Sequence, residues 1–134
     1  MLVITEEMKN VLSKMHPPVV ATADRSGKPN VVPIGFTRVI SDDEILLMDN
    51  YMNKTRANID ANPQVAISAW SLDDRIGYQF KGKARIITSG PVFDEGAEWV
   101  HTHRPQATPR AAIIVKIEEI YLIGSDDKAG KRVA

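Results

Sequence analysis

The sequence PVVATADRSGKPNVVPIGFTRVISDDEILLMDN, residues 18–50, carries the main signal for the fold class. It holds three runs rich in β-branched and apolar residues, separated only by the turn sequences DRSG (24–27) and SDDE (41–44). Gly27 suits the left-handed conformation of a short hairpin loop. Strands joined by such short connections pair antiparallel, and no crossover helix stands between them as a doubly wound sheet requires. The stretch therefore predicts three consecutive antiparallel strands.

Three helices are expected around these strands. The first begins after Thr5, a favourable N-cap residue, and is stopped by the prolines at 17–18. The second is expected over 53–61. The third begins at Pro91, because proline suits the first position of a helix.

Three further strands, expected at 64–70, 78–87 and 111–124, complete the pattern. The apolar residues in the two halves of the last strand are out of step, which predicts a β-bulge near Glu118-Glu119. The order of elements predicts a mainly β protein: a six-stranded antiparallel barrel with peripheral helices. The polar residues 125–134 are expected to form a mobile tail.

The composition limits the classes of function. The 134 residues fit one domain, 1–134, and 43% hydrophobic residues supply a core without disulfides or metals. The chain has no cysteine, which excludes thiol nucleophiles and zinc–thiolate sites. Basic and acidic residues number 17 each, and this neutral balance disfavours nucleic-acid binding. No stretch is long and apolar enough to span a membrane and no signal-peptide pattern is present, so a cytoplasmic protein is expected.

Pro33 and Gly35 interrupt the second of the expected strands, NVVPIGFTRVI (30–40). Proline cannot donate to a sheet ladder, and glycine leaves space above the backbone. Because the two residues are two apart, they mark the same face of the strand. An edge strand with a bulge is the simpler interpretation. The functional alternative is a strand whose backbone approaches a flat ligand.

The charges at the start of the second helix are reversed relative to the helix dipole. Asn53 is placed to cap this helix, yet Lys54 and Arg56 occupy its first turn, where acids are favourable. Two solvated surface cations would be the ordinary explanation. In the functional alternative, backbone N–H groups, the Thr55 hydroxyl and the Lys54 ammonium converge on a phosphate. No GxxxxGK[ST] motif precedes the helix, so this is not a P-loop.

Two other groups of residues carry weaker signals. Lys81, Lys83 and Arg85 alternate along one strand and are expected to form a solvated face. His101 and His103 would point to different sides of a helix and have no third ligand nearby, so surface histidines are expected rather than a metal site. No GxSxG elbow marks a hydrolase.

Three segments occur in a specific order: VVATADRSGKPNVVPIGF (19–36), ILLMDNYMNKTRANIDANPQVAI (45–67) and GYQFKGKARIITSGPVFDE (77–95). In this order and spacing the chain resembles the pyridoxamine 5′-phosphate oxidase-like family of flavin-binding split barrels, over roughly residues 5–123. It is most similar in size to the small FMN-binding proteins of that family. The resemblance implies a Greek-key split β-barrel that forms a homodimer, with FMN in a groove at the dimer interface.

The resemblance also implies which residues hold the cofactor. The 32–37 stretch would run along the flavin, the 48–51 stretch would lie beside the ribityl chain and ring, and Lys54 and Thr55 would bind the phosphate. The second subunit would complete the site, with Gln79 and Trp99 as candidates. The implied cofactor-binding residues are Val32, Pro33, Ile34, Gly35, Phe36, Thr37, Met48, Asp49, Asn50, Tyr51, Lys54, Thr55, Gln79 and Trp99.

The activity that the resemblance implies is that of an FMN-dependent oxidoreductase or an electron carrier with a small-molecule or protein redox partner. No catalytic side chain is assigned, because the flavin itself carries the electrons. Oxidation of pyridoxamine phosphate is not expected, since the C-terminal Arg and His residues of the true oxidases have no counterpart in GSDDKAGKRVA (124–134). The alternative function is a dimeric binding or regulatory module on the same barrel, either without a cofactor or with a deazaflavin.

Overall fold

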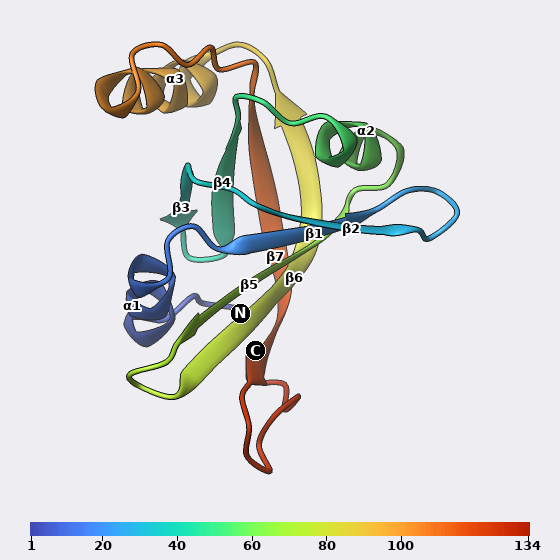
Figure 1. Cartoon of the computed structure of the whole chain (residues 1–134), viewed down its shortest axis with the longest axis vertical. Helices are drawn as coiled ribbons and strands as arrows, with labels where there is room; N and C mark the ends of the chain where they lie inside the picture. The colour runs from blue at the N-terminus through green and yellow to red at the C-terminus, as the bar shows by residue number, and fades with distance from the viewer.

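All strands of the protein join one antiparallel sheet, and three helices lie at its periphery (Figure 1). The computed structural model describes residues 1–134. The elements in chain order are α1 (Glu6–Lys14), β1 (Val19–Ala23), β2 (Pro29–Pro33), β3 (Thr37–Ser41), β4 (Glu44–Asp49), α2 (Lys54–Ala61), β5 (Gln64–Ser71), β6 (Ile76–Ile87), α3 (Pro91–His103) and β7 (Ala111–Ile123). The three expected helices are confirmed. No helix combines the length and the apolar character needed to cross a bilayer.

The sheet is curled, and its connections require the curl. The strand order is β2-β1-β5-β6-β7-β4-β3, so β2 and β3 lie at opposite edges although only residues 34–36 connect them. A flat sheet of this order would be about 29 Å wide at ~4.8 Å per strand, whereas four Cα steps span at most about 14 Å. The two edges must therefore approach each other, which gives the split-barrel shape.

The connection 34–36 also explains why the strand count is seven and not the expected six. The run 30–40, expected as one strand, is divided into β2 and β3. Pro33 has no N–H to donate, and the Thr37 hydroxyl donates to the Ile34 carbonyl at 2.8 Å to close a turn. The Ile34 N–H then donates to the Pro18 carbonyl at 3.2 Å, while the Phe36 carbonyl accepts from the Met48 N–H at 3.0 Å. In all other respects the expected fold class is confirmed.

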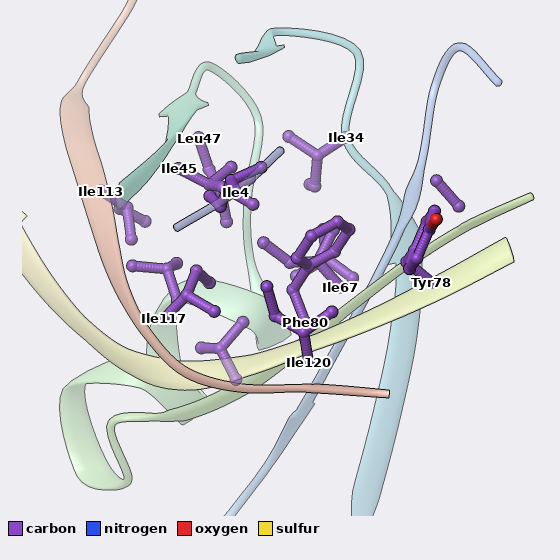
Figure 2. Packing of buried hydrophobic residues seen from close by; sticks show 14 of the residues in the cluster. Ile4, Ile34, Ile45, Leu47, Ile67, Tyr78, Phe80, Ile113, Ile117 and Ile120 are labelled. Carbon is purple, nitrogen blue, oxygen red and sulfur yellow. The ribbon is translucent and has the colours of Figure 1, made fainter. Parts of the chain in front are cut away.

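The interior of the curled sheet is filled by apolar side chains that alternate with outward-facing ones along each strand. Figure 2 shows Ile45, Ile67, Phe80 and Ile120 pointing inward from β4, β5, β6 and β7. All four are less than 1% exposed. Ile4, just before α1, closes one side of this core. The solvated face expected along β6 is confirmed, because Lys81, Lys83 and Arg85 are exposed and alternate with the buried Phe80 and Gly82.

A smaller core lies on the other face of β4 and β7, under α3. Met48 and Ile114 pack there against Val100 of α3. The two strands are therefore buried on both faces, which explains their continuous apolar sequences. Gly96 allows the close approach of α3, since a Cβ at this position would lie 2.5 Å from the Met48 sulfur.

The expected β-bulge is confirmed. Lys81 pairs with Glu119 and Gly82 pairs with Ile117, so Glu118 has no partner on β6. The strands approach so closely at this point that a Cβ on Gly82 would lie 2.0 Å from the Lys116 carbonyl oxygen. Only glycine fits there.

Residues 130–134, the end of the expected mobile tail, are paired with the end of β7. The Val133 N–H donates to the Ile120 carbonyl at 2.8 Å, and the Leu122 N–H donates to the Lys131 carbonyl at 2.8 Å. The reason is that β4 pairs only with residues 111–116 of β7, which leaves the edge of the last β7 residues without a strand partner. The returning chain supplies those hydrogen bonds, and Ala134 packs against the barrel core.

Candidate functional site

A groove with a volume of about 380 Å³ opens where four segments meet: the β2–β3 connection, the loop after β4, the start of α2 and the end of α3. Small-molecule sites have volumes of about 300–1,000 Å³. In Figure 1, α2 and α3 flank the upper end of β4, from which this loop leaves. The groove is lined by Asn30, Val32, Pro33, Ile34, Gly35, Phe36, Met48, Asn50, Tyr51, Met52, Asn53, Lys54, Thr55 and Arg104.

Most of the residues that the sequence singled out lie in this groove. The structure brings together the 32–36 segment, the loop residues Met48, Asn50 and Tyr51, and the Lys54-Thr55 pair. Four predicted residues lie outside its lining: Thr37, Asp49, Gln79 and Trp99.

One end of the groove has the properties of an anion site. The first turn of α2 contains no acid, and Asn53 stands at the N-cap without making a side-chain capping bond. The first N–H groups of the helix therefore keep no capping partner. Lys54 is exposed, lines the groove and forms no ion pair within 4.0 Å. Free N–H groups and a free ammonium are the donors that a phosphate requires.

Thr55 lies directly beside Lys54 and is only 3% exposed. Its hydroxyl oxygen accepts from the Asn30 amide at 3.1 Å, but its hydroxyl proton has no acceptor in the protein. Buried polar hydrogens are normally satisfied by the protein, by water or by a ligand, so a donor without a protein acceptor at the wall of a groove is available to a ligand there.

Arg56 has a different role from the one that the charge pattern suggested. Its guanidinium donates to the Asp49 carboxylate at 2.8 Å, and the same carboxylate accepts from Arg110 at 2.9 Å. The Asp49 side chain has no exposed surface, and it also accepts from the Met52 N–H at 3.0 Å. The anion that Arg56 binds is therefore a carboxylate of the chain itself and not a ligand. Asp49 holds the loop that carries the groove residues and does not line the groove.

The other part of the groove is apolar and open. Ile34, Phe36 and Met52 line it, and a Cβ added at Gly35 would meet nothing within 4 Å. The space above Gly35 is thus free for a ligand, as the sequence suggested for this face. The polar end and the apolar part together suit a phosphorylated ligand with a flat apolar portion.

The predicted residues outside the groove have structural surroundings of their own. The Trp99 ring packs edge-on against Phe36 at 5.2 Å between centroids, with the Arg38 guanidinium 4.1 Å from its centre. Trp99 thereby supports the apolar wall from behind. Gln79 lies on the outer face of the sheet, in the cross-strand row that also contains Ser68.

Four groove residues were not identified from the sequence: Asn30, Met52, Asn53 as a lining residue, and Arg104. The strand period could have found Asn30, because it shares the inward face of β2 with Val32. Arg104 follows α3, and nothing local connects it with a loop fifty residues earlier. His101 and His103 each contact a backbone carbonyl, of Ala107 and Trp99 respectively.

The sequence profile of the pyridoxamine 5′-phosphate oxidase family matches residues 4–124 of the chain. A protein of Methanocaldococcus jannaschii, described as uncharacterized, is 35% identical over 133 residues, which cover 98% of this chain and 88% of that protein.

Solved structures with the same fold include HupZ of Group A Streptococcus, with a TM-score of 0.83 and 31% identity over 95% of this chain and 99% of that one. An FMN-binding protein of Syntrophomonas wolfei has a TM-score of 0.79 and 17% identity, over 90% of this chain and 86% of that one. An F420 reductase has a TM-score of 0.66 and 18% identity, over 87% of this chain and 97% of that one. A heme binding protein of Mycobacterium smegmatis has a TM-score of 0.68 and 13% identity, over 91% of this chain and 54% of that one. At identities this low, the last three similarities show the fold alone.

Proposed function

Because the chain belongs to the pyridoxamine 5′-phosphate oxidase family, we propose that it is a homodimeric FMN-binding flavoprotein that exchanges electrons with a small-molecule or protein partner. One observation carries the proposal. A lysine without an ion pair, a threonine whose hydroxyl proton lacks an acceptor, and an open glycine face all line one groove.

The residues present fit the two chemical parts of FMN. The phosphate would be bound by Lys54, the Thr55 hydroxyl and the first N–H groups of α2. The apolar wall of Ile34 and Phe36 would exclude water from one side of the ring, and Gly35 would let the ring approach the backbone. When bound, FMN would supply the one- or two-electron chemistry, while these residues bind and orient it.

The fold is also found in proteins described as an F420 reductase and a heme binding protein, so the fold alone does not specify the ligand and the groove residues must. A deazaflavin phosphate would meet the same donors and is the second ligand to test. Histidine is the commonest axial ligand of haem iron, and no histidine lines this groove. The groove therefore supports a flavin better than a haem.

The homodimer is supported by the outer face of the sheet. Val31, Ala21 and Ala66 form one cross-strand row on this face, with Val31 62% exposed. Trp70 on β5 is also exposed, at 41%. Exposed apolar residues on a sheet face of otherwise small side chains suit a second copy of the chain. Gln79 lies on the same face, from which it could reach the groove of that copy.

The test is a visible absorption spectrum of the purified protein, recorded before and after addition of FMN and removal of free flavin by desalting. We expect retained flavin bands, with weaker retention of riboflavin because it lacks the phosphate. A protein that retains neither flavin would overturn the proposal, and the deazaflavin would then be tried in the same assay. If FMN is retained, the protein is next mixed with a reduced nicotinamide nucleotide. Rapid reduction of the bound flavin would indicate a reductase, and little or no reduction would indicate an electron carrier.

A further inference from the structure

We infer that Asn30 is a positioning residue of the phosphate site, because its amide group orients the Thr55 hydroxyl so that the hydroxyl proton faces the groove. The inference rests on the proposed function, since it assigns a further residue to the same site. Asn30 lines the groove from β2, and Thr55 lines it from the first turn of α2, 25 residues later.

The orientation follows from the donors and acceptors of the two side chains. The Asn30 amide nitrogen donates to the Thr55 hydroxyl oxygen at 3.1 Å, so one lone pair of that oxygen is occupied. The hydroxyl proton must then point in a different tetrahedral direction. In a helix interior this proton usually goes to a carbonyl one turn earlier, but Thr55 is the second residue of α2 and has no preceding helical turn. The groove is the side that remains.

Asn30 cannot donate to a phosphate itself. A primary amide has two N–H donors, and the second donates to the Thr22 hydroxyl at 3.3 Å. Both donors of Asn30 are thus engaged by threonines, and its remaining polar atom is a carbonyl oxygen, which repels an anion. Its effect on a bound phosphate must therefore act through Thr55.

The orienting amide is itself held in place. Thr22 is 4% exposed, and its hydroxyl oxygen accepts from the Asn58 amide at 3.0 Å as well as from Asn30. Asn58 lies one turn after Thr55 on α2. The network therefore joins β1, β2 and α2 at the place where the groove needs a fixed donor.

The experiment measures dissociation constants for FMN and riboflavin by flavin fluorescence, in the wild type, Asn30→Ala, Thr55→Val and the double variant. We expect Asn30→Ala to weaken FMN binding about 3- to 10-fold, as the loss of one oriented hydrogen bond does, and to change riboflavin binding less than twofold. In the Thr55→Val background the same substitution should change FMN binding less than twofold. Such non-additivity is the mark of a residue that acts through its neighbour.

Asn10→Ala is the matched control, because Asn10 is exposed on α1 and neither contacts Thr55 nor lines the groove. It should leave the ratio of FMN to riboflavin affinity unchanged. Asn30→Asp is the second variant should Asn30→Ala fail to fold. It keeps the volume and replaces the donor by an acceptor that turns the Thr55 proton away from the groove, so a larger loss of FMN affinity is expected.

The outcomes separate the inference from the proposed function. If the wild type binds FMN no more tightly than riboflavin, both are overturned. If the wild type prefers FMN and both Asn30 variants keep that preference, only the inference is overturned. An equal loss for both flavins, or an undiminished effect in the Thr55→Val background, would show a general structural role and would also overturn it.

Discussion

At the scale of single residues, Lys54 and Arg56 show how one turn of helix gives two cations opposite roles. Both lie in the first turn of α2 and carry the same charge. Arg56 nevertheless points inward to the buried Asp49 carboxylate, while Lys54 stays exposed at the groove. The difference lies in their position around the helix, since residues two apart point to different sides. Only Lys54 remains available to a ligand.

The first prediction concerns Lys54. Lys54→Met should weaken FMN binding about 10-fold, near the lower end of the ~1.5–3 kcal/mol of a charge-assisted contact because the ammonium is exposed and screened by salt. Riboflavin binding should not change. Titration by flavin fluorescence measures both constants, with Lys128→Met, an exposed lysine outside the groove, as the control. Unchanged FMN affinity in Lys54→Met would remove Lys54 from the phosphate site.

The second prediction concerns Asp49, whose carboxylate accepts from two guanidiniums and from the Met52 N–H. Asp49→Asn should lower the free energy of unfolding by about 3 kcal/mol, the lower end for a broken buried ion pair, because both arginines keep contact with water. Urea denaturation measures this loss. Arg110, which Asp49 holds in place, also donates to the Met52 carbonyl in the loop after β4. Without the carboxylate this loop should loosen, and flavin binding should weaken as well. A variant as stable as the wild type would contradict the clamping role of Asp49.

At the scale of elements, polar contacts tie α1 to the sheet: Lys14 pairs with Asp74 in the β5–β6 turn, and Glu7 contacts Tyr78 on β6. The Tyr78 hydroxyl on β6 donates to a Glu7 carboxylate oxygen on α1 at 2.8 Å. Burial, together with the hydrogen bond and charge of Glu7, raises the pKa of Tyr78 to about 12, because all of them disfavour the phenolate. The ordinary tyrosine value is 10.0.

The third prediction follows from this pKa. Between pH 10 and 12 the folded protein keeps a proton that the unfolded chain has lost, so the Tyr78 contribution to stability is complete below pH 10 and disappears as the pH rises toward 12. The free energy of unfolding of the wild type should exceed that of Tyr78→Phe by about 1 kcal/mol at pH 8. This difference should shrink steadily above pH 10. Denaturation of both proteins at several pH values measures it, and a constant difference would contradict the assignment.

At the scale of the whole molecule, the curl of the sheet assembles the groove. It brings the β2 edge and the β2–β3 connection beside the loop after β4, and α3 adds Arg104 from a distant part of the chain. The same curl leaves an outer face of small and apolar side chains across β2, β1 and β5. The site and the proposed dimer surface are thus two consequences of one sheet geometry.

The fourth prediction is the dimer. Light scattering at micromolar concentration should give a mass of twice the 14.8 kDa chain. Ala66→Glu places a charge in the centre of the outer face and should yield a monomer that still folds but binds FMN more weakly, because the partner would no longer complete the site. Lys128→Glu, in the turn after β7, is the control and should remain dimeric. A monomeric wild type would contradict the proposed interface and the contribution of the partner.

Features that depend on neighbours a few residues apart could be predicted from the amino-acid sequence. Alternation, turn residues and helix caps gave the type and order of the elements, the bulge at Glu118, and the adjacent Lys54-Thr55 pair at a helix start. The order of three motifs was enough to identify the family. These signals are local, because periodicity and capping act within one or two turns of the backbone.

Contacts between distant groups could not be predicted from the sequence, because they depend on how the whole chain folds. The pairing of Arg56 and Arg110 with Asp49, the engagement of Thr55 by Asn30, the entry of Arg104 into the groove and the docking of residues 130–134 on β7 all join segments separated along the chain. The same holds for the division of residues 30–40 into two edge strands, which the closure of the barrel imposes. A side chain has several possible partners of equal chemistry, and the packing of the whole sheet determines which of them comes within hydrogen-bonding distance.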